Sequence, residues 1–257
     1  MPMEARKLLY ATDLKENSLS FSLLKGILPV CELDFDEIAF LQTTPFDLWI
    51  KGLFDLNIKS KIILDDQLLP HVILKAAKNE EASLIVVNLE RKEVKTSRSS
   101  IIRQLIKDSS VPLIFINHAN HKTGPDQKGL FAHIVFATDW SYKSEKALAF
   151  VLDFKKIVGE MEIVNVIKGK LTIKEMRELK NRLAETRKIC LDNEIDAESH
   201  IYAGNTSAEI QTAAKDYKGT MIVIGGESEK KSLRRLLKKS SSGKVSCEAD
   251  LPVLVVP

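Results

Sequence analysis

The sequence predicts an α/β protein built from two tandem units, each with a parallel sheet. One observation is that short apolar, strand-like runs alternate with stretches of helical spacing along the 257 residues, which is typical of strand–helix–strand units. A second is that this pattern starts again after a polar stretch near the middle. The first apolar run ends in Ala-Thr-Asp at Asp13, and the same three residues end a similar run at Asp139, 126 positions later. We therefore expect two copies of one fold.

The first half contains the elements of one such unit. Five runs have the apolar character of buried parallel strands, at residues 7–13, 37–42, 61–64, 83–88 and 111–116. Helical spacing predicts helices at residues 14–28, 68–78 and 101–107, with Pro29 ending the first of them. Residues 45–58 are unusually apolar and aromatic, which favours a short packed helix or, if exposed, a partner surface. A charged loop is expected over residues 89–98.

The second half repeats this order after a linker. Residues 117–129 are polar, contain Gly-Pro and lack periodicity. Strands are then predicted at residues 133–139, 161–167, 198–202, 221–225 and 251–256, and helices at 144–157, 171–193, 207–217 and within 226–250. We predict a first, shortened domain over residues 1–118, a linker over 119–130 and a second domain over 131–257.

Composition narrows the functional classes. A net charge of +3, with Lys and Arg interspersed among Asp and Glu, gives no basic face for nucleic acid. No apolar run approaches the roughly 20 residues that span a bilayer, and the sequence enters a strand pattern directly, so we expect neither a membrane segment nor a signal peptide. Cys31, Cys190 and Cys247 are far apart and odd in number, which favours reduced thiols in a cytoplasmic protein. The five histidines have no metal-ligand spacing, so no metal is expected.

Residues typical of catalysis are not recognisable in the sequence. There is no Ser/His/Asp or Cys/His arrangement in a familiar context, and no Gly-Lys-Ser phosphate loop. Asp65 and Asp66 are paired acids, but they lie in a polar turn. We therefore expect that the protein is not an enzyme.

The two halves resemble tandem universal stress proteins. Each half opens with a strand that ends in Asp and closes with strand, loop, helix and a Leu-Pro or Val-Pro pair before apolar residues. Residues 8–13 and 133–139 look like the first strand of that family, and residues 221–256 look like its last βαβ unit. The resemblance implies two five-stranded parallel sheets of the adenine nucleotide alpha hydrolase-like, Rossmann-like kind. It also implies an internal pseudo-dimer of the two domains, with a further homodimer possible.

The resemblance also implies a candidate nucleotide site in the second domain. Nucleotide-binding members carry a loop of the form G-x2-G-x9-G-[S/T] after the fourth strand, and here Gly226 matches its first glycine and Ser240 its hydroxyl. Glu229 and Lys239 stand where the other two glycines are expected, so a carboxylate and a side chain intrude where phosphate and close backbone approach are wanted. The candidate binding residues are Ala137, Asp139, Val166, Gly225, Gly226, Ser240 and Ser241.

Each of these features also has a purely structural interpretation. In the first half only Asp13 and Ser100 match the family pattern, and Asp13 is better explained as a helix cap. Asp139 either contacts a nucleoside or caps the helix that follows. The basic run 230–239 is explained better as a solvated helix face than as a phosphate or acidic-partner site.

We expect a non-enzymatic stress-response adaptor or regulator with protein partners and no cofactor. The duplicated scaffold and the broken loop together favour this function. The alternative is a switch that binds ATP or AMP in the second domain only, with or without slow ATP hydrolysis.

Overall fold

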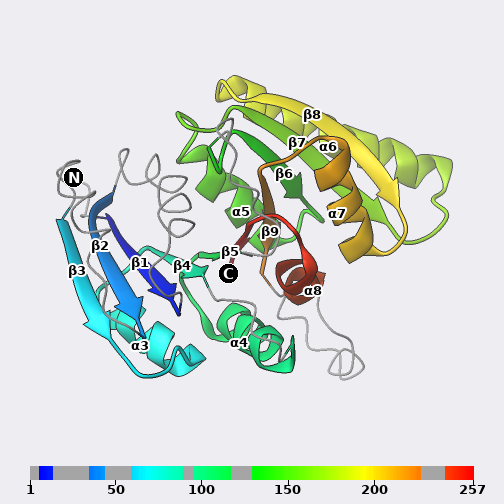
Figure 1. Cartoon of the computed structure of the whole chain (residues 1–257). Helices are drawn as coiled ribbons and strands as arrows, with labels where there is room; N and C mark the ends of the chain where they lie inside the picture. Colours follow the sequence, from blue (N-terminus) through cyan, green and yellow to red (C-terminus); the bar gives the residue numbers. More distant parts are fainter. Residues whose placement is uncertain (1–5, 14–34, 44–58, 89–94, 117–128, 227–240) are drawn as a thin grey trace. The chain divides into compact units, whose positions relative to one another are not determined.

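The computed structural model describes residues 6–13, 35–43, 59–88, 95–116, 129–226 and 241–257. The chain divides into two compact units, Met1–Gly129 and Leu130–Pro257. Figure 1 shows the strands and helices of both units. The helices expected at residues 14–28 and 45–58, the linker, and the basic run 230–239 lie outside the described residues.

The first unit is a parallel sheet of five strands with the order β3-β2-β1-β4-β5. Its strands are β1 (Arg6–Thr12), β2 (Phe35–Gln42), β3 (Lys59–Leu64), β4 (Leu84–Asn88) and β5 (Leu113–Ile116). The central strands β1 and β4 are apolar along almost their whole length and buried on both faces, as expected for parallel strands covered by helices. The predicted strands of this half are therefore confirmed, with ends that differ by one or two residues.

Two described helices pack against each other in the first unit, α3 (Pro70–Asn79) and α4 (Lys95–Asp108). Pro70 begins α3, where its fixed φ suits the first turn and its missing N–H costs no hydrogen bond. The prediction of a loop up to residue 98 is wrong, since α4 begins at Lys95. Its first turns are rich in Lys, Thr, Ser and Arg, so they carry no apolar periodicity from which a helix could be recognised.

The second unit has the same strand order, β10-β9-β6-β7-β8, and all its pairings are parallel. Its strands are β6 (His133–Ala137), β7 (Glu160–Ile167), β8 (Asp196–Ala203), β9 (Met221–Gly225) and β10 (Val253–Val256). The expected α/β class with five-stranded parallel sheets is confirmed. Because the chain runs outward from β6 to β8 and then returns through β9 to β10, the connections reverse direction beside β6, which creates a topological switch point.

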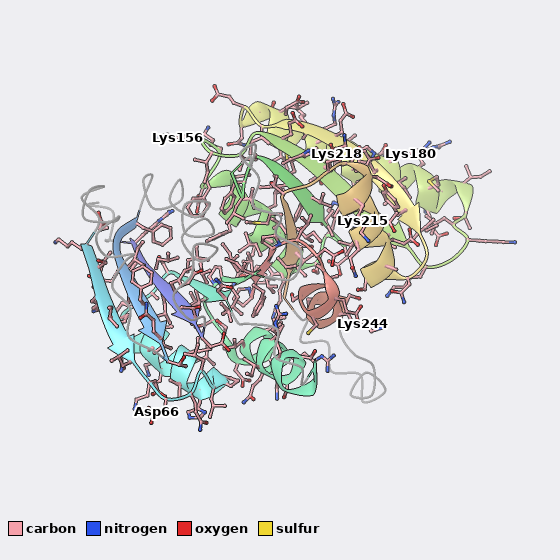
Figure 2. All side chains as sticks on the ribbon, viewed as in Figure 1. Asp66, Lys156, Lys180, Lys215, Lys218 and Lys244 are labelled. Carbon is pink, nitrogen blue, oxygen red and sulfur yellow. The ribbon has the colours of Figure 1, made fainter. Side chains whose placement is uncertain are left out.

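Four described helices cover this second sheet: α5 (Tyr142–Leu152), α6 (Ile173–Asp192), α7 (Thr206–Asp216) and α8 (Ser241–Glu248). Right-handed crossovers place α5 and α6 on one face and α7 and α8, which contact each other, on the opposite face (Figure 1). Surface lysines such as Lys156, Lys180 and Lys215 extend outward from this unit (Figure 2). Of the helices in the described ranges, none combines the length and apolar character that crossing a bilayer requires.

Local hydrogen bonds mark where α6 begins and where α5 ends. Thr172 begins α6 with a capping box: Glu175 N–H donates to the Thr172 hydroxyl at 3.2 Å, and Thr172 N–H donates to the Glu175 carboxylate at 2.8 Å. The prediction that the first helix of this unit continues to residue 157 is wrong, because α5 ends at Leu152. Beyond Leu152, backbone hydrogen bonds join residues three positions apart instead of four, such as Phe154 N–H to the Val151 carbonyl at 2.9 Å.

Cys190 carries a thiol in the core of the second unit. It is fully buried on α6, with its sulfur 3.6 Å from the Met161 sulfur on β7, and burial raises the pKa of its thiol to about 11. In a Cys31→Ala/Cys247→Ala variant we expect Cys190 to react with an aromatic disulfide reagent at pH 8 on the order of a hundredfold more slowly in the native state than in denaturant. Equal rates in the two states would contradict this burial.

Candidate functional site

The candidate site lies where β6 and β9 end side by side in the second unit. Ala137 on β6 pairs with Ile224 on β9, so the segments that follow these two strands emerge together. In open α/β sheets the carboxyl ends of the strands at a switch point are where ligands bind. Of the predicted residues, Ala137, Val166, Gly225 and Gly226 lie at the ends of β6, β7 and β9, and Asp139 follows β6 by two positions.

Asp139 is held in one orientation by hydrogen bonds to a single carboxylate oxygen. Its Oδ1 accepts from the backbone N–H of Ser141 and from the hydroxyl of Ser144, both at 3.0 Å. Partial desolvation would raise the pKa of Asp139, but the hydrogen bonds from Ser141 and Ser144 outweigh it and hold the pKa below its ordinary value. The residue is exposed, and its Oδ2 accepts no hydrogen bond from any residue in the described ranges. An exposed, ionised carboxylate can therefore accept hydrogen bonds from a ligand.

The interpretation of Asp139 as the cap of the following helix is wrong. Ser141 is the N-cap of α5, and its hydroxyl accepts from the backbone N–H of Ser144 at 3.4 Å. Asp139 instead accepts from residue 141, two positions on, which is the local turn typical of Asp before a helix. The sequence Asp-Trp-Ser-Tyr offers two capping side chains, and the direction of the chain at Trp140 decides between them.

Trp140 is the neighbouring residue that sequence reasoning missed. Its backbone has φ of 51°, in the left-handed region that a bulky residue rarely adopts, and its N–H donates to the Thr138 hydroxyl at 3.0 Å. Its indole N–H donates to the Thr186 hydroxyl on α6 at 3.0 Å, and the Arg182 guanidinium lies 5.7 Å from the ring centre. These contacts anchor the loop that carries Asp139 to α6. The signal available in the sequence was a Trp directly after a strand-end Asp.

The two glycines at the end of β9 are explained by the protein's own packing. A Cβ on Gly225 would lie 2.6 Å from the backbone nitrogen of Ser144, so α5 begins directly against this position. A Cβ on Gly226 would lie 3.1 Å from Pro257 Cα, and its N–H donates to the Val256 carbonyl at 2.7 Å. Both glycines are therefore in close contact with the chain's own backbone, which is one physical reason for a residue without a side chain at these positions.

The remaining predicted residues are divided between the strand ends and the segment before α8. Ala137 and Val166 are half-buried. Beside them, the Asn165 side-chain amide donates a hydrogen bond to the Thr138 carbonyl at 2.8 Å, which links the ends of β7 and β6. Ser241 is exposed at the first position of α8. Ser240 lies outside the described residues, as do Glu229 and Lys239, so the phosphate end of the predicted site has no described geometry.

The first unit differs at the position that corresponds to Gly225. Asn88 ends β4 there and is fully buried, and its amide donates to the Tyr10 hydroxyl at 2.6 Å. Burial raises the pKa of Tyr10 above its ordinary value, and the bond from Asn88 offsets part of that rise. Of the two family matches predicted here, Ser100 is exposed on α4 and Asp13 directly follows β1. A polar side-chain pair therefore fills the first unit where the second has a glycine.

A second polar cluster lies on the α7 face of the second sheet, away from the candidate site. Glu162 on β7 is 8% exposed, and its two oxygens contact His133 Nε2 on β6 at 2.9 Å and His200 Nε2 on β8 at 2.6 Å. His200 Nδ1 lies 2.9 Å from the Tyr217 hydroxyl, and these two rings stack at 4.2 Å. With both imidazoles protonated on Nε2, the buried carboxylate accepts two hydrogen bonds and His200 Nδ1 accepts a third from Tyr217.

This cluster was not predicted from the sequence. It includes two of the five histidines for which no metal-ligand spacing was found. Within the described ranges, no group of three or more His, Cys, Asp or Glu side chains is arranged to hold a metal ion. Its His and Glu residues belong to three different strands and Tyr217 ends α7, and only the alternation of Glu160 and Glu162 with apolar residues along β7 could have indicated that one of these acids points inward.

The strand order and the switch-point site define a Rossmann-like α/β protein. Solved structures agree with this class. The universal stress protein from Archaeoglobus fulgidus DSM 4304 is 21% identical, with 97% of this chain and 95% of that chain covered and a TM-score of 0.69. A putative universal stress protein from Pseudomonas aeruginosa UCBPP-PA14 is 15% identical, with 98% and 93% covered and a TM-score of 0.67.

A family model matches the second unit. Residues 131–257 match the model of the universal stress protein family, which places this likeness on the second unit. A universal stress protein from Archaeoglobus fulgidus solved in complex with dAMP is 22% identical, with 50% of this chain and 99% of that chain covered and a TM-score of 0.40. A comparison with curated proteins gives no match.

Proposed function

We propose that this universal-stress-type protein is a non-enzymatic adaptor or regulator in a stress response, acting through protein partners rather than through a bound nucleotide. The observation that carries the proposal is the way the protein packs its own strand ends. Gly225 is closed against the backbone of Ser144, and the corresponding Asn88 of the first unit is fully buried. Gly226, which matches the first glycine of the family's loop, has its N–H bonded to the Val256 carbonyl at 2.7 Å and its Cβ position 3.1 Å from Pro257 Cα, so its backbone makes internal contacts too.

The unusual residues of the loop support the same function. Glu229 places a carboxylate in the loop where phosphate is expected, and Lys239 adds a side chain at a glycine position. The two units would form an internal pseudo-dimer, and a further homodimer of the chain is compatible with this arrangement. A protein with this function acts by presenting surfaces, so its partners would contact the exposed parts of the two units.

One observation favours the alternative of an adenine-nucleotide switch in the second unit. Asp139 presents an ionised carboxylate whose Oδ2 accepts no hydrogen bond within the described residues. A ribose or base could donate to that oxygen at the switch point. The alternative thus depends on Asp139, whereas the proposed function does not.

Isothermal titration of the full chain with ATP and with AMP separates the two functions. We expect no binding in the micromolar range by the wild-type protein, and no excess absorbance at 260 nm in the purified sample. Asp139→Ala is the diagnostic variant, and Asp192→Ala is the matched control, because Asp192 is an exposed acid at the end of α6, outside the candidate site. Micromolar binding that Asp139→Ala abolishes and Asp192→Ala preserves would overturn the proposed function in favour of the switch.

A further inference from the structure

Among the strands that the structure describes, β8 is an edge of the second sheet, because it is the last strand in the order β10-β9-β6-β7-β8. Just beyond β8, Gly204 N–H donates to the Ile167 carbonyl of β7. Successive residues of a strand turn their backbone groups to opposite sides, so the even-numbered residues of β8 face β7 and the odd-numbered ones face outward. Ala197 agrees with this parity, since its carbonyl accepts from the Arg187 Nε at 2.7 Å. Ser199 and Ile201 therefore present their N–H and C=O groups to the edge.

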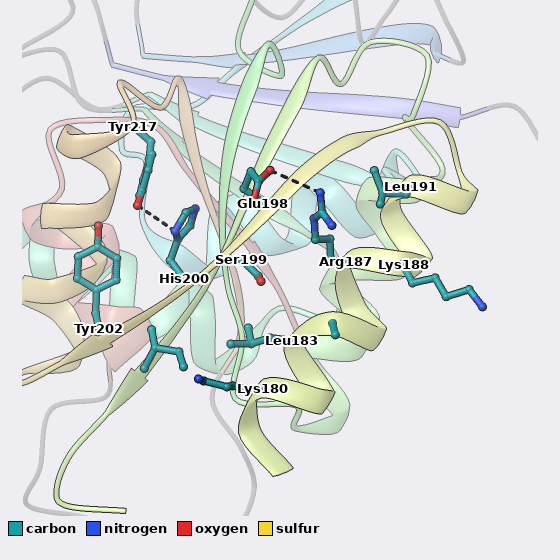
Figure 3. A pocket seen from close by; sticks show the side chains of 12 residues that line it. Lys180, Leu183, Arg187, Lys188, Leu191, Glu198, Ser199, His200, Tyr202 and Tyr217 are labelled. Carbon is teal, nitrogen blue, oxygen red and sulfur yellow. Dashed lines mark hydrogen bonds and ion pairs between the residues drawn. The ribbon is translucent and has the colours of Figure 1, made fainter. Parts of the chain in front are cut away.

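A groove of about 690 Å³ follows this edge between α6 and the end of α7 (Figure 3). Its apolar lining includes Leu183, Leu191 and Ile201, and Leu191 is 43% exposed, an apolar side chain with little cover. Tyr202 and Tyr217 supply aromatic rings and hydroxyls on the α7 side. The groove therefore combines free backbone hydrogen-bonding groups with apolar and aromatic contacts, as required where an extended peptide adds to a sheet.

The residues that line the groove include more cations than anions. Lys180, Arg187 and Lys188 line it from α6, and Glu198 is the one acid among the lining residues. Glu198 is paired with Arg187 at 3.5 Å, which leaves the two lysines without an acid in the groove. Lys180 extends toward the Tyr202 end of β8, whereas Lys188 extends outward from α6 (Figure 3). Among the lining residues, Lys180 and Lys188 are therefore the cations available to an acidic ligand, while Asp216 bonds the Tyr202 hydroxyl at the α7 side.

These charges decide which occupant fits. A second copy of the chain pairing edge to edge would bring Lys180 and Lys188 of both copies together, and like charges repel. An acidic segment meets the same lysines with opposite charge. The Arg187 side chain donates to the Ala197 carbonyl, so this carbonyl cannot accept from an added strand. Ser199 and Ile201 therefore remain as the pairing positions.

We propose that the groove along β8 binds an extended acidic segment of a partner protein, which adds as a strand beside Ser199 and Ile201 and places its carboxylates near Lys180 and Lys188. This proposal deepens the proposed adaptor function and rests on it only in naming a partner surface. The titration with nucleotide at Asp139 is a separate measurement, so either proposal can fail alone.

The test uses the full chain and a fluorescein-labelled peptide of sequence Asp-Val-Glu-Ile-Asp-Val-Glu-Ile, followed by fluorescence anisotropy. We expect saturable binding that weakens about five- to thirtyfold in Lys180→Glu/Lys188→Glu, as two exposed ion pairs allow. Lys155→Glu/Lys156→Glu is the matched control, because these exposed lysines lie outside the groove and its charge change is identical. The control is expected to bind like the wild type.

A second peptide tests the backbone pairing. The same sequence with alternate residues N-methylated keeps every charge but loses the donors on one edge, so we expect its binding to be lost. Equal binding of the methylated peptide, or equal weakening by the control variant, would overturn the proposal. Absence of peptide binding, together with a sedimentation coefficient that falls in Lys180→Glu/Lys188→Glu, would assign the edge to a second copy and overturn it as well.

Discussion

Glu162→Leu is expected to lower the free energy of unfolding of the second unit by about 2–4 kcal/mol, because it leaves two imidazole N–H groups without their acceptor. His133 is 8% exposed and can recruit little water, whereas His200 is only half-buried and contributes the smaller part. Urea unfolding measures the effect in a Trp49→Phe background. The sequence has two tryptophans, so Trp140 fluorescence then reports on the second unit alone.

Glu162→Gln is the matched control for this loss. The amide oxygen can accept from one histidine, and its NH₂ can donate to the other once that imidazole changes tautomer. Tyr217 permits this change at His200, because its hydroxyl can accept from Nδ1–H as readily as it can donate to Nδ1. We expect a loss of less than about 1 kcal/mol for this variant. Equal stability of Glu162→Leu and the wild type would show that the cluster contributes nothing to folding.

Gly225→Ala is expected to destabilise the second unit by about 1–3 kcal/mol, because the added methyl group meets backbone rather than a movable side chain. The new Cβ would lie 2.6 Å from Ser144 N and 2.7 Å from the Lys143 carbonyl carbon. Relief requires the start of α5 to move away from β9. That movement would also displace the Ser144 hydroxyl from Asp139, so the candidate site and the fold are coupled through this glycine.

The control for this substitution is Gly169→Ala, because a Cβ at Gly169 has no atom within 4 Å. We expect its free energy of unfolding to stay within about 0.5 kcal/mol of the wild type. The same Trp140 fluorescence measurement compares the two variants. If Gly225→Ala is as stable as Gly169→Ala, β9 and α5 have room for the added methyl group. Packing would then no longer explain the glycine at position 225, and ligand binding would become the better explanation.

Much of the fold was predictable because its signals are local. Strands such as β1 and β9 are short apolar runs, and α6 has its own capping residue and buried stripe, so each could be recognised without knowing its neighbours. The prediction failed at α4, whose first turn begins at Lys95. No apolar periodicity marks that turn, so nothing in the residues themselves distinguished it from a charged loop.

The candidate site was predictable in position but not in geometry. Asp139 could be found from the sequence because it ends the repeated strand pattern, and strand ends of this kind gather at one edge of a parallel sheet. Which group it contacts could not be found in this way. The left-handed backbone of Trp140 turns the chain so that Ser141 becomes the helix cap and Asp139 accepts from Ser141 and Ser144.

The sequence by itself determined the strand and helix order of each unit, the repeat of that order and the strand-end position of Asp139. Only the tertiary structure decided that Gly225 faces Ser144, that Glu162 bridges His133 and His200, and that lysines of α6 line a groove along the edge strand β8. The physical reason is the range of the interactions. Burial periodicity and capping act within a few residues, whereas contacts between strands depend on register and crossover, which bring together residues 29 and 38 positions apart.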